Sequence, residues 1–229
     1  MPIYRIADLN VEVNPKFKIC RKRLESYAVK SNESGKTDIA ISVSDDEIRE
    51  RLRLSDNLSE QGAEDVLILS KFCNAVLDGF DGFFFHSSCL ELDGEGYVFS
   101  AVSGTGKSTH TALWRRHFGN RVTMINDDKP VIRKCDGKFY VYGTPWMGKA
   151  DIGTNTKAPV KAVYILKRAE ENMAVRVLPS QVMKQLLEAT VIDVERSRME
   201  KLLELLDEFF KKTPLFLLGC CLLYTSDAA

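Results

Sequence analysis

The chain has 229 residues, 45% of them hydrophobic and 28% charged, so it is long enough to bury the core of one globular protein. Its 32 lysines and arginines balance 32 aspartates and glutamates, which gives no electrostatic case for binding nucleic acid or an anionic membrane. The longest apolar stretch, residues 214–224, is far shorter than a membrane span and the amino terminus lacks a signal-peptide pattern, so we expect a cytoplasmic protein.

The first 62 residues are expected to form a small α+β region. Residues 3–13 alternate polar and apolar side chains, as a strand does, and Ser44 to Glu47 form a capping box that opens a helix. The other elements expected here are a helix over 16–27, a strand over 37–43, and linkers over 31–36 and 55–62. The basic run from Lys16 to Arg23 is interpreted as the solvated face of the helix rather than as a site for a polyanion.

Residues 63–220 are expected to form the main domain, a mixed α/β core. Hairpin turns and helical crossovers alternate along this part of the chain, which favours a sheet of mixed direction. The predicted strands are 83–92, 96–100, 121–126, 131–134, 139–142, 159–166 and 215–218, and the predicted helices are 64–80, 109–117, one from Ser180 and 196–211. Residues 221–229 look like translated adapter sequence, so they are left out of the fold prediction.

A glycine-rich turn between a strand and a helix predicts a phosphate-binding loop. The segment Ser-Gly-Thr-Gly-Lys-Ser-Thr covers residues 103–109. Gly104 and Gly106 allow positive φ angles, which turn backbone N–H groups toward an anion at the start of a helix. Lys107 is expected to reach the β- and γ-phosphates of a nucleotide, and Ser108 to present its hydroxyl to Mg²⁺.

The nucleotide-binding residues of this prediction belong to one continuous motif. They are Ser103, Gly104, Thr105, Gly106, Lys107, Ser108 and Thr109. The motif has Ala101 where the general pattern has its first glycine. An ordinary turn with a solvated lysine is the alternative, but the strand before the loop and the helix after it are the context that the motif requires.

Two adjacent aspartates follow the next predicted strand. Asp127 and Asp128 lie about 20 residues beyond Lys107, where the chain returns beside the phosphate loop. A nucleotide-bound Mg²⁺ needs a carboxylate besides the Ser108 hydroxyl, and an acceptor hydroxyl needs a carboxylate to take its proton. We expect one aspartate in each role, with Asp127 as the metal ligand and Asp128 as the base. The alternative is a polar turn before Pro130.

Two further features lie near this predicted cleft. His86 is on the strand before the phosphate-loop strand, and either a catalytic role beside an aspartate or an ordinary core position fits it. Residues 143–149 form a loop marked by glycine and proline, with a tryptophan and a lysine that look exposed. This loop is interpreted as a flap over the nucleotide or acceptor, with a plain strand connection as the alternative.

Three segments together resemble the active-site series of the HPr kinase/phosphorylase and phosphoenolpyruvate carboxykinase-like superfamily. They are residues 85–88, 103–109 and 126–130, within a resemblance that covers about 83–168. The resemblance implies a P-loop core with a mixed sheet of the carboxykinase-like type, and ATP and Mg²⁺ as cofactors. Lys107 and Ser108 match its phosphate and metal residues, Asp127 and Asp128 its aspartate pair, and His86 the histidine beside them.

The sequence therefore predicts an ATP- and Mg²⁺-dependent phosphotransferase, most simply a serine (hydroxyl) kinase. No match to the second glycine-rich segment of HPr kinases is found, so HPr is not expected to be the substrate, and the acceptor is an unidentified protein, peptide or small molecule. Homo-oligomer formation and the reverse, phosphorylase reaction stay open. The alternatives are a non-catalytic ATP-binding regulatory module and a carboxykinase-type lyase.

Overall fold

A computed structural model describes residues 1–30, 35–55, 57–102, 104–190 and 196–221 of the chain. Ser103 of the phosphate loop and residues 222–229 of the expected adapter tail lie outside the described residues. Among the helices of the described part, none is long and apolar enough to cross a membrane. The fold is mixed α/β, as the sequence predicts.

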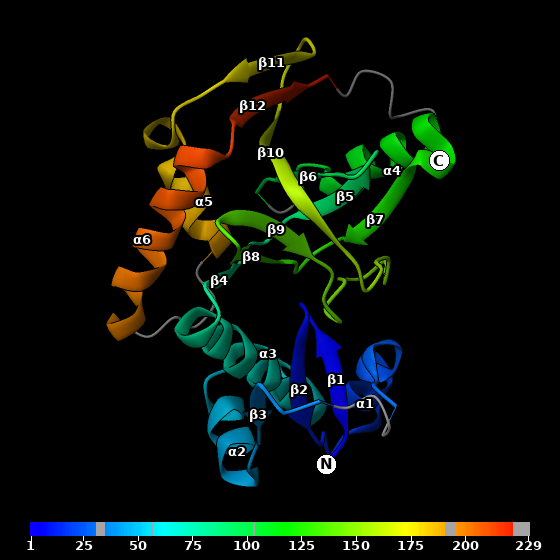
Figure 1. Cartoon of the computed structure of the whole chain (residues 1–229), viewed down its shortest axis with the longest axis vertical. Helices are drawn as coiled ribbons and strands as arrows, with labels where there is room; N and C mark the ends of the chain where they lie inside the picture. Colours follow the sequence, from blue (N-terminus) through cyan, green and yellow to red (C-terminus); the bar gives the residue numbers. More distant parts are fainter. Residues whose placement is uncertain (31–34, 56, 103, 191–195, 222–229) are drawn as a thin grey trace.

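The N-terminal part contains a three-stranded sheet and three helices (Figure 1). Its strands are β1 (Ile3–Ile6), β2 (Leu9–Val13) and β3 (Ile39–Ile41), and its three α-helices are α1 (Lys18–Leu24), α2 (Asp45–Arg53) and α3 (Glu60–Gly79). A 3-10 turn, η1 (Glu25–Tyr27), follows α1. The predicted capping box is present, because Ser44 Oγ accepts from the backbone N–H of Glu47 and the Glu47 side chain accepts from the backbone N–H of Ser44. This reciprocal pair fixes the start of α2 at the predicted residue.

The single strand predicted over 3–13 is wrong. The segment is a hairpin, in which β1 and β2 pair antiparallel around a turn at Ala7 and Asp8. Both turn residues have positive φ, of 52° and 63°. Two such residues in succession make the tight turn whose twist matches that of a hairpin. The turn contains no glycine, so the usual sequence signal of a hairpin turn is missing.

The main sheet has nine strands of mixed direction. Seven follow the order β4-β8-β9-β10-β6-β5-β7, and β12 pairs with β10 and with β11. Their bounds are β4 (Gly82–Phe84), β5 (Ser88–Leu92), β6 (Glu95–Ser100), β7 (Val122–Asn126), β8 (Val131–Cys135), β9 (Lys138–Tyr142), β10 (Lys157–Arg168), β11 (Met173–Arg176) and β12 (Leu215–Cys220). The order places β5 between β6 and β7, antiparallel to both.

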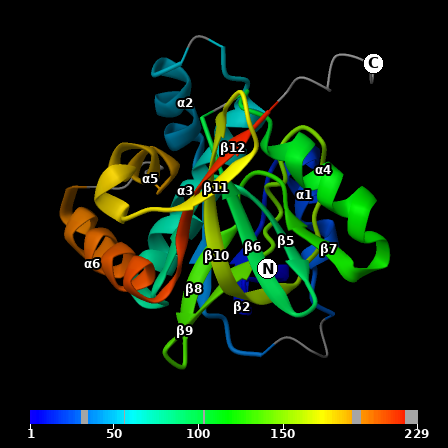
Figure 2. The same ribbon diagram turned by 90° about the horizontal axis from the view of Figure 1, so that it is seen from above.

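Helices cover both sides of this sheet, with α4 on one side and α5 and α6 on the other (Figures 1 and 2). They are α4 (Lys107–Phe118), with the 3-10 turn η2 (Gly119–Arg121) after it, α5 (Met183–Thr190), with η3 (Pro179–Gln181) before it, and α6 (Arg196–Lys212). Successive side chains of a strand point to opposite faces of the sheet, so each face packs against its own helices. Val98 packs in the cluster with α5 and α6, whereas Phe99 packs in the cluster beside α4.

Two further expectations for the core need correction. The strand predicted over 83–92 is two strands, β4 and β5, which pair with different partners because the chain leaves one ladder at Phe85 and joins another at Ser88. Strand β11 was not predicted, since all four of its residues are exposed and it lacks the apolar alternation of a half-buried strand.

Trp146 is buried, with 3% of its surface exposed, so the exposed tryptophan expected in the 143–149 loop is wrong. Its ring stacks on Phe72 of α3 with centroids 5.8 Å apart, and its indole N–H donates to Asp65 Oδ1 at 3.1 Å. One hydrophobic cluster includes Trp146, Phe72 and the buried residues of β1 and β2. The division into residues 1–62 and 63–220 stays a prediction, and α3 packs against elements on both sides of it.

Candidate active site

The phosphate-loop motif lies between a strand and a helix, as the sequence predicts. Strand β6 ends at Ser100 and α4 begins at Lys107. Gly104 and Gly106 have φ angles of 78° and 109°, in the left-handed region that favours glycine. The turn is held from within by Thr105, whose backbone N–H and hydroxyl both donate to the Val102 carbonyl, at 3.2 and 2.7 Å.

Lys107 is partly buried at the start of α4, and its charge interacts with those of Asp127 and Asp128. Its ammonium donates to the Ala101 carbonyl at 3.2 Å, so it lies back along the loop. Burial lowers the pKa of Lys107, while the charges of Asp128 and Asp127 act in the opposite direction. The loop therefore brings a cation close to the predicted carboxylate pair.

Asp127 is buried, and its carboxylate is linked through Ser88 to Thr111 of α4. Ser88 Oγ donates to Asp127 Oδ1, and the same hydroxyl lies 3.1 Å from Thr111 Oγ1. Asp127 also lines a cavity of about 380 Å³ together with Ser108 and Thr109. The carboxylate of Asp127 and the hydroxyl of Ser108, which are predicted to hold Mg²⁺, thus belong to residues that line the same cavity.

Asp128 has a different set of partners. Its Oδ1 lies 3.0 Å from His86 Nε2, and its Oδ2 is in contact with the Lys129 ammonium. Burial would raise the pKa of Asp128, but the hydrogen bonds from His86 and Lys129 outweigh it and hold the pKa at about 2. Asp128 is therefore a carboxylate at neutral pH, with 20% of its side chain exposed.

His86 is positioned between strands rather than within one. Its backbone N–H donates to the Ala189 carbonyl of α5 at 2.7 Å, and its own carbonyl accepts from Ser100 Oγ at 3.0 Å. These two bonds attach the break between β4 and β5 to the end of the phosphate-loop strand. The imidazole then reaches Asp128, so the geometry favours the site position for His86 over the ordinary core position.

A buried amide shapes the turn that carries the aspartates. Asn126 Oδ1 accepts the backbone N–H groups of Asp128 and Lys129, at 2.8 and 2.7 Å. Its Nδ2 donates to the Thr144 carbonyl at 3.0 Å and lies 3.2 Å from Thr144 Oγ1. Thr144 Oγ1 in turn donates to the Lys129 carbonyl at 2.5 Å. Asn126 and Thr144 are fully buried, so this network sets the backbone beneath Asp128.

The loop predicted as a flap is packed in its first half and open in its second. Residues 143–147 are buried, whereas Gly148 and Lys149 are exposed. Gly148 has a φ of 71°, and a Cβ added there would lie 3.0 Å from Asp128 Cβ. The loop therefore passes directly over Asp128, and a side chain at position 148 would press on it.

Five residues of this site were given no role from the sequence. They are Ser88, Thr111, Asn126, Lys129 and Thr144. Asn126 and Lys129 flank the aspartate pair in the sequence, and this position could have indicated that they belong to the site. Ser88, Thr111 and Thr144 lie on other elements, and ordinary hydroxyl residues there carry no pattern that points to Asp127 or Asp128.

Within the described residues, no group of three or more histidine, cysteine or acidic side chains could hold a metal ion by itself. A metal carried by a nucleotide has a smaller requirement, because the phosphates and water fill most of its coordination positions. One carboxylate and one hydroxyl, as Asp127 and Ser108 provide on one cavity, fit that requirement.

Comparison with known proteins does not assign the chain to a family. No family model matches the chain, and no curated protein matches it in sequence. Among solved structures, the HPr(Ser) kinase/phosphatase from Coxiella burnetii is similar at 11% sequence identity, with 60% of this chain and 85% of that chain covered and a TM-score of 0.36. A likeness this weak does not show what the site of this chain does.

Proposed function

We propose that the protein is an ATP- and Mg²⁺-dependent phosphotransferase that phosphorylates a hydroxyl group, most simply a serine kinase. One observation carries the proposal: a glycine loop with its lysine faces two adjacent carboxylates that have separate sets of partners. A phosphate-binding turn alone would fit any nucleotide-binding module. The second carboxylate, open to solvent and ionised, is the group that transfer to a hydroxyl requires.

The donor side of the site is assigned to the phosphate loop and Asp127. Backbone N–H groups of residues 103–109 would hold the phosphates at the start of α4, and Lys107 would contact the β- and γ-phosphates. Ser108 and Asp127 would hold Mg²⁺, which when bound neutralises charge on the phosphates. Ser88 orients Asp127 through its hydroxyl and is itself placed by Thr111.

The acceptor side is assigned to Asp128. In the proposed step, the acceptor oxygen forms a bond to the γ-phosphorus, the bond from that phosphorus to the β–γ bridging oxygen breaks, and ADP leaves with the electron pair. The hydroxyl proton passes to Asp128 and from there to solvent. A carboxylate with a pKa near 2 is a weak base. Its main contribution is therefore to orient the hydroxyl, which suits a loose transition state in which the proton leaves late.

ADP production from ATP tests this function without a known acceptor, because water can replace the hydroxyl. We expect slow hydrolysis by the wild type and a loss of about a hundredfold in Asp128→Asn, because the neutral amide no longer positions the attacking water as the carboxylate does. Asp136→Asn is the matched control, because it makes the same chemical change outside the site, in the β8–β9 turn. Tight ATP binding with no turnover in wild type would instead favour the non-catalytic module.

A further inference from the structure

A large cavity lies on the other side of the loop that covers Asp128. It has a volume of about 600 Å³ and is lined by α1 and η1 on one wall and by residues between 145 and 153 on the other. That volume is within the range of ligand-binding pockets. The phosphotransferase assignment gives this cavity no role, and the site residues of the phosphate loop do not line it.

Gly148 connects the cavity to the proposed chemistry. It lines the cavity, and a Cβ added to it would lie 3.4 Å from Asp128 Cγ and 3.6 Å from Asp128 Oδ2. Only the backbone of a glycine therefore separates the cavity from the carboxylate. The cavity with Ser108 and Asp127 is lined by Ala150 and Ile152, whereas Gly148, Asp151 and Gly153 line the larger one.

We propose that this larger cavity receives the phosphoryl acceptor, a peptide segment that carries a hydroxyl residue flanked by charged side chains of both signs. The proposal rests on the phosphotransferase function. Transfer in line places the donor and the acceptor on opposite sides of the moving phosphoryl group. Residues of segment 148–153 line both cavities; Asp127 lines the smaller one, and Asp128 lies close to Gly148 of the larger one.

The chemistry of the walls indicates a charged peptide rather than a polyanion or an apolar molecule. Lys22 on α1, Glu25 on η1 and Asp151 on the loop are exposed, and none of them has an ion-pair partner within the described part of the chain. Charges of both signs disfavour an acceptor with several phosphates, and free charges disfavour an apolar one. Ile19, with 48% of its surface exposed, adds an apolar contact at the same wall.

One part of the wall is preformed. Arg23 Nε lies 3.2 Å from Asp65 Oδ1, the atom that also accepts from the Trp146 indole. Through this shared carboxylate, α1 is tied to α3 and to the covering loop. A wall fixed in this way lowers the ordering cost of binding a flexible segment. It leaves Lys22, Glu25 and Asp151 as free charges, of which Lys22 and Asp151 lie on opposite walls and would select the two flanks of the acceptor.

The test uses a pool of synthetic nonapeptides with serine fixed at the centre and random flanks. The pool is bound to the immobilised full chain without nucleotide, and the retained peptides are sequenced. We expect enrichment of acidic residues at one flank and basic residues at the other, by about two- to fivefold, as for a pair of partly exposed charges. Lys22→Glu should remove the acidic preference, and Asp151→Asn the basic one.

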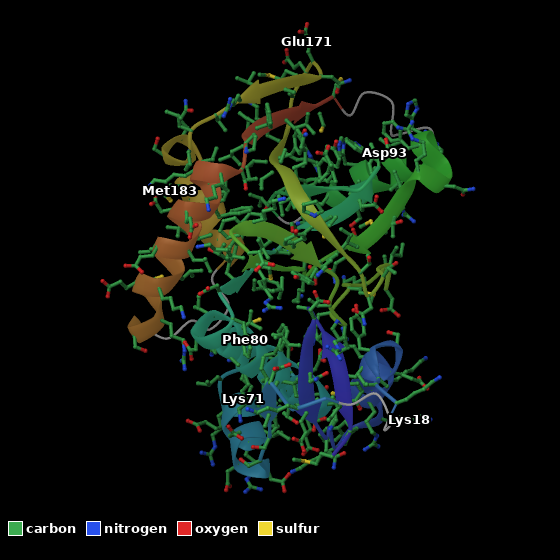
Figure 3. All side chains as sticks on the ribbon, viewed as in Figure 1. Lys18, Lys71, Phe80, Asp93, Glu171 and Met183 are labelled. Atoms are coloured by element: carbon green, nitrogen blue, oxygen red, sulfur yellow. The ribbon has the colours of Figure 1, made fainter. Side chains whose placement is uncertain are left out.

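Lys18→Glu is the matched control, because Lys18 lies on the same helix outside the cavity wall (Figure 3) and the change of charge is identical. This control should leave both preferences intact. Retention of no peptide, retention without charge preference, or preferences unchanged by Lys22→Glu and Asp151→Asn would overturn the proposal. Selective retention combined with absence of ATP binding would keep the peptide site and reject the kinase, so the two failures are distinguishable.

Discussion

Asp127 and Asp128 are adjacent in sequence, yet their side chains are held by different elements. Ser88 of β5 holds Asp127, whereas His86 and Lys129 hold Asp128. Both residues lie in the bend after β7, where Asn126 bonds to the following backbone N–H groups, and this bend directs the two carboxylates to different partners. In the proposed function, one turn would thus serve a metal and an acceptor at once. Removal of either charge should therefore have its own effect.

Asp127→Asn should raise the Mg²⁺ concentration needed for ATP binding, because a neutral amide is a poorer ligand for this hard cation. Asp128→Asn should leave that requirement near the wild-type value. Titrations of ATP binding at a series of Mg²⁺ concentrations compare the two variants. An unchanged Mg²⁺ requirement in Asp127→Asn would contradict the metal role assigned to this residue.

The aspartate pair could be predicted from the sequence because the signal is local: a strand ends, and two carboxylates follow it near a phosphate loop. The partners of the pair could not. Ser88 and Asp127 are 39 positions apart, and Asn126 and Thr144 are 18 apart. Such contacts depend on how the strands pack, and a single hydroxyl has no periodicity from which to infer them. The setting of the glycine-rich turn between a strand and a helix was predictable, whereas the residues that orient the two carboxylates were not.

The network at the end of β7 fixes the conformation of the whole aspartate turn. Thr144→Val keeps the shape of the side chain but removes the hydroxyl that bonds to the Lys129 carbonyl and lies near the Asn126 amide. We expect a loss of about 1–3 kcal/mol in the free energy of unfolding, the cost of leaving buried polar groups unsatisfied. Chemical denaturation measures it, and Thr144→Ser should recover most of the loss. Equal stability of Thr144→Val and wild type would show that the network does not support the turn.

The start of α2 should be sensitive to acid. The hydrogen bond from Lys71, followed by that from the Ser44 backbone, lowers the pKa of Glu47 below the ordinary value. A lowered folded-state pKa stabilises the protein above the pKa of the unfolded state, about 4.3, and this contribution is lost as pH falls through the folded-state value. Glu47→Gln should thus be less stable than wild type at pH 7, and the difference should vanish in acid. A difference independent of pH would contradict the charge effect.

At the level of elements, sequence patterns located α2, α4 and the β8–β9 hairpin because caps and turn residues mark their ends. They did not separate β1 from β2 or β4 from β5. In the first case the turn lacks glycine, and in the second three phenylalanines run through the break between two ladders. Apolar residues that are buried for different reasons produce one continuous pattern.

Across the whole molecule, Trp146 joins the N-terminal part to the covering loop of the site. Its partner Asp65 is 81 positions away, which is why the burial of this tryptophan was not apparent from its glycine- and proline-rich surroundings. Strand order in the nine-stranded sheet likewise depends on pairings distant in sequence. The class of fold could be predicted from the alternation of hairpins and helices, but the sheet order could not.

Trp146→Ala should destabilise the protein by about 3–5 kcal/mol, as expected for removal of a large buried aromatic side chain. Trp146→Phe should cost less, because it keeps an aromatic ring against Phe72 and loses only the hydrogen bond to Asp65. Thermal or chemical unfolding of the two variants measures the difference. A loss below 1 kcal/mol in Trp146→Ala would contradict the packing role of this residue.

The central claim is that the loop with Lys107 binds the phosphates of ATP. Calorimetric titration of ATP·Mg²⁺ tests it most directly, with wild type, Lys107→Ala and, as a control at an exposed lysine, Lys138→Ala. Lys107 supplies the ammonium of the phosphate loop, and Lys138 lies at the start of β9 outside the site. Wild type and Lys138→Ala should bind equally, and Lys107→Ala should bind at least about tenfold more weakly, because a charge-assisted contact to phosphate is lost. Absence of binding to wild type, or equal affinity in all three proteins, would contradict the account.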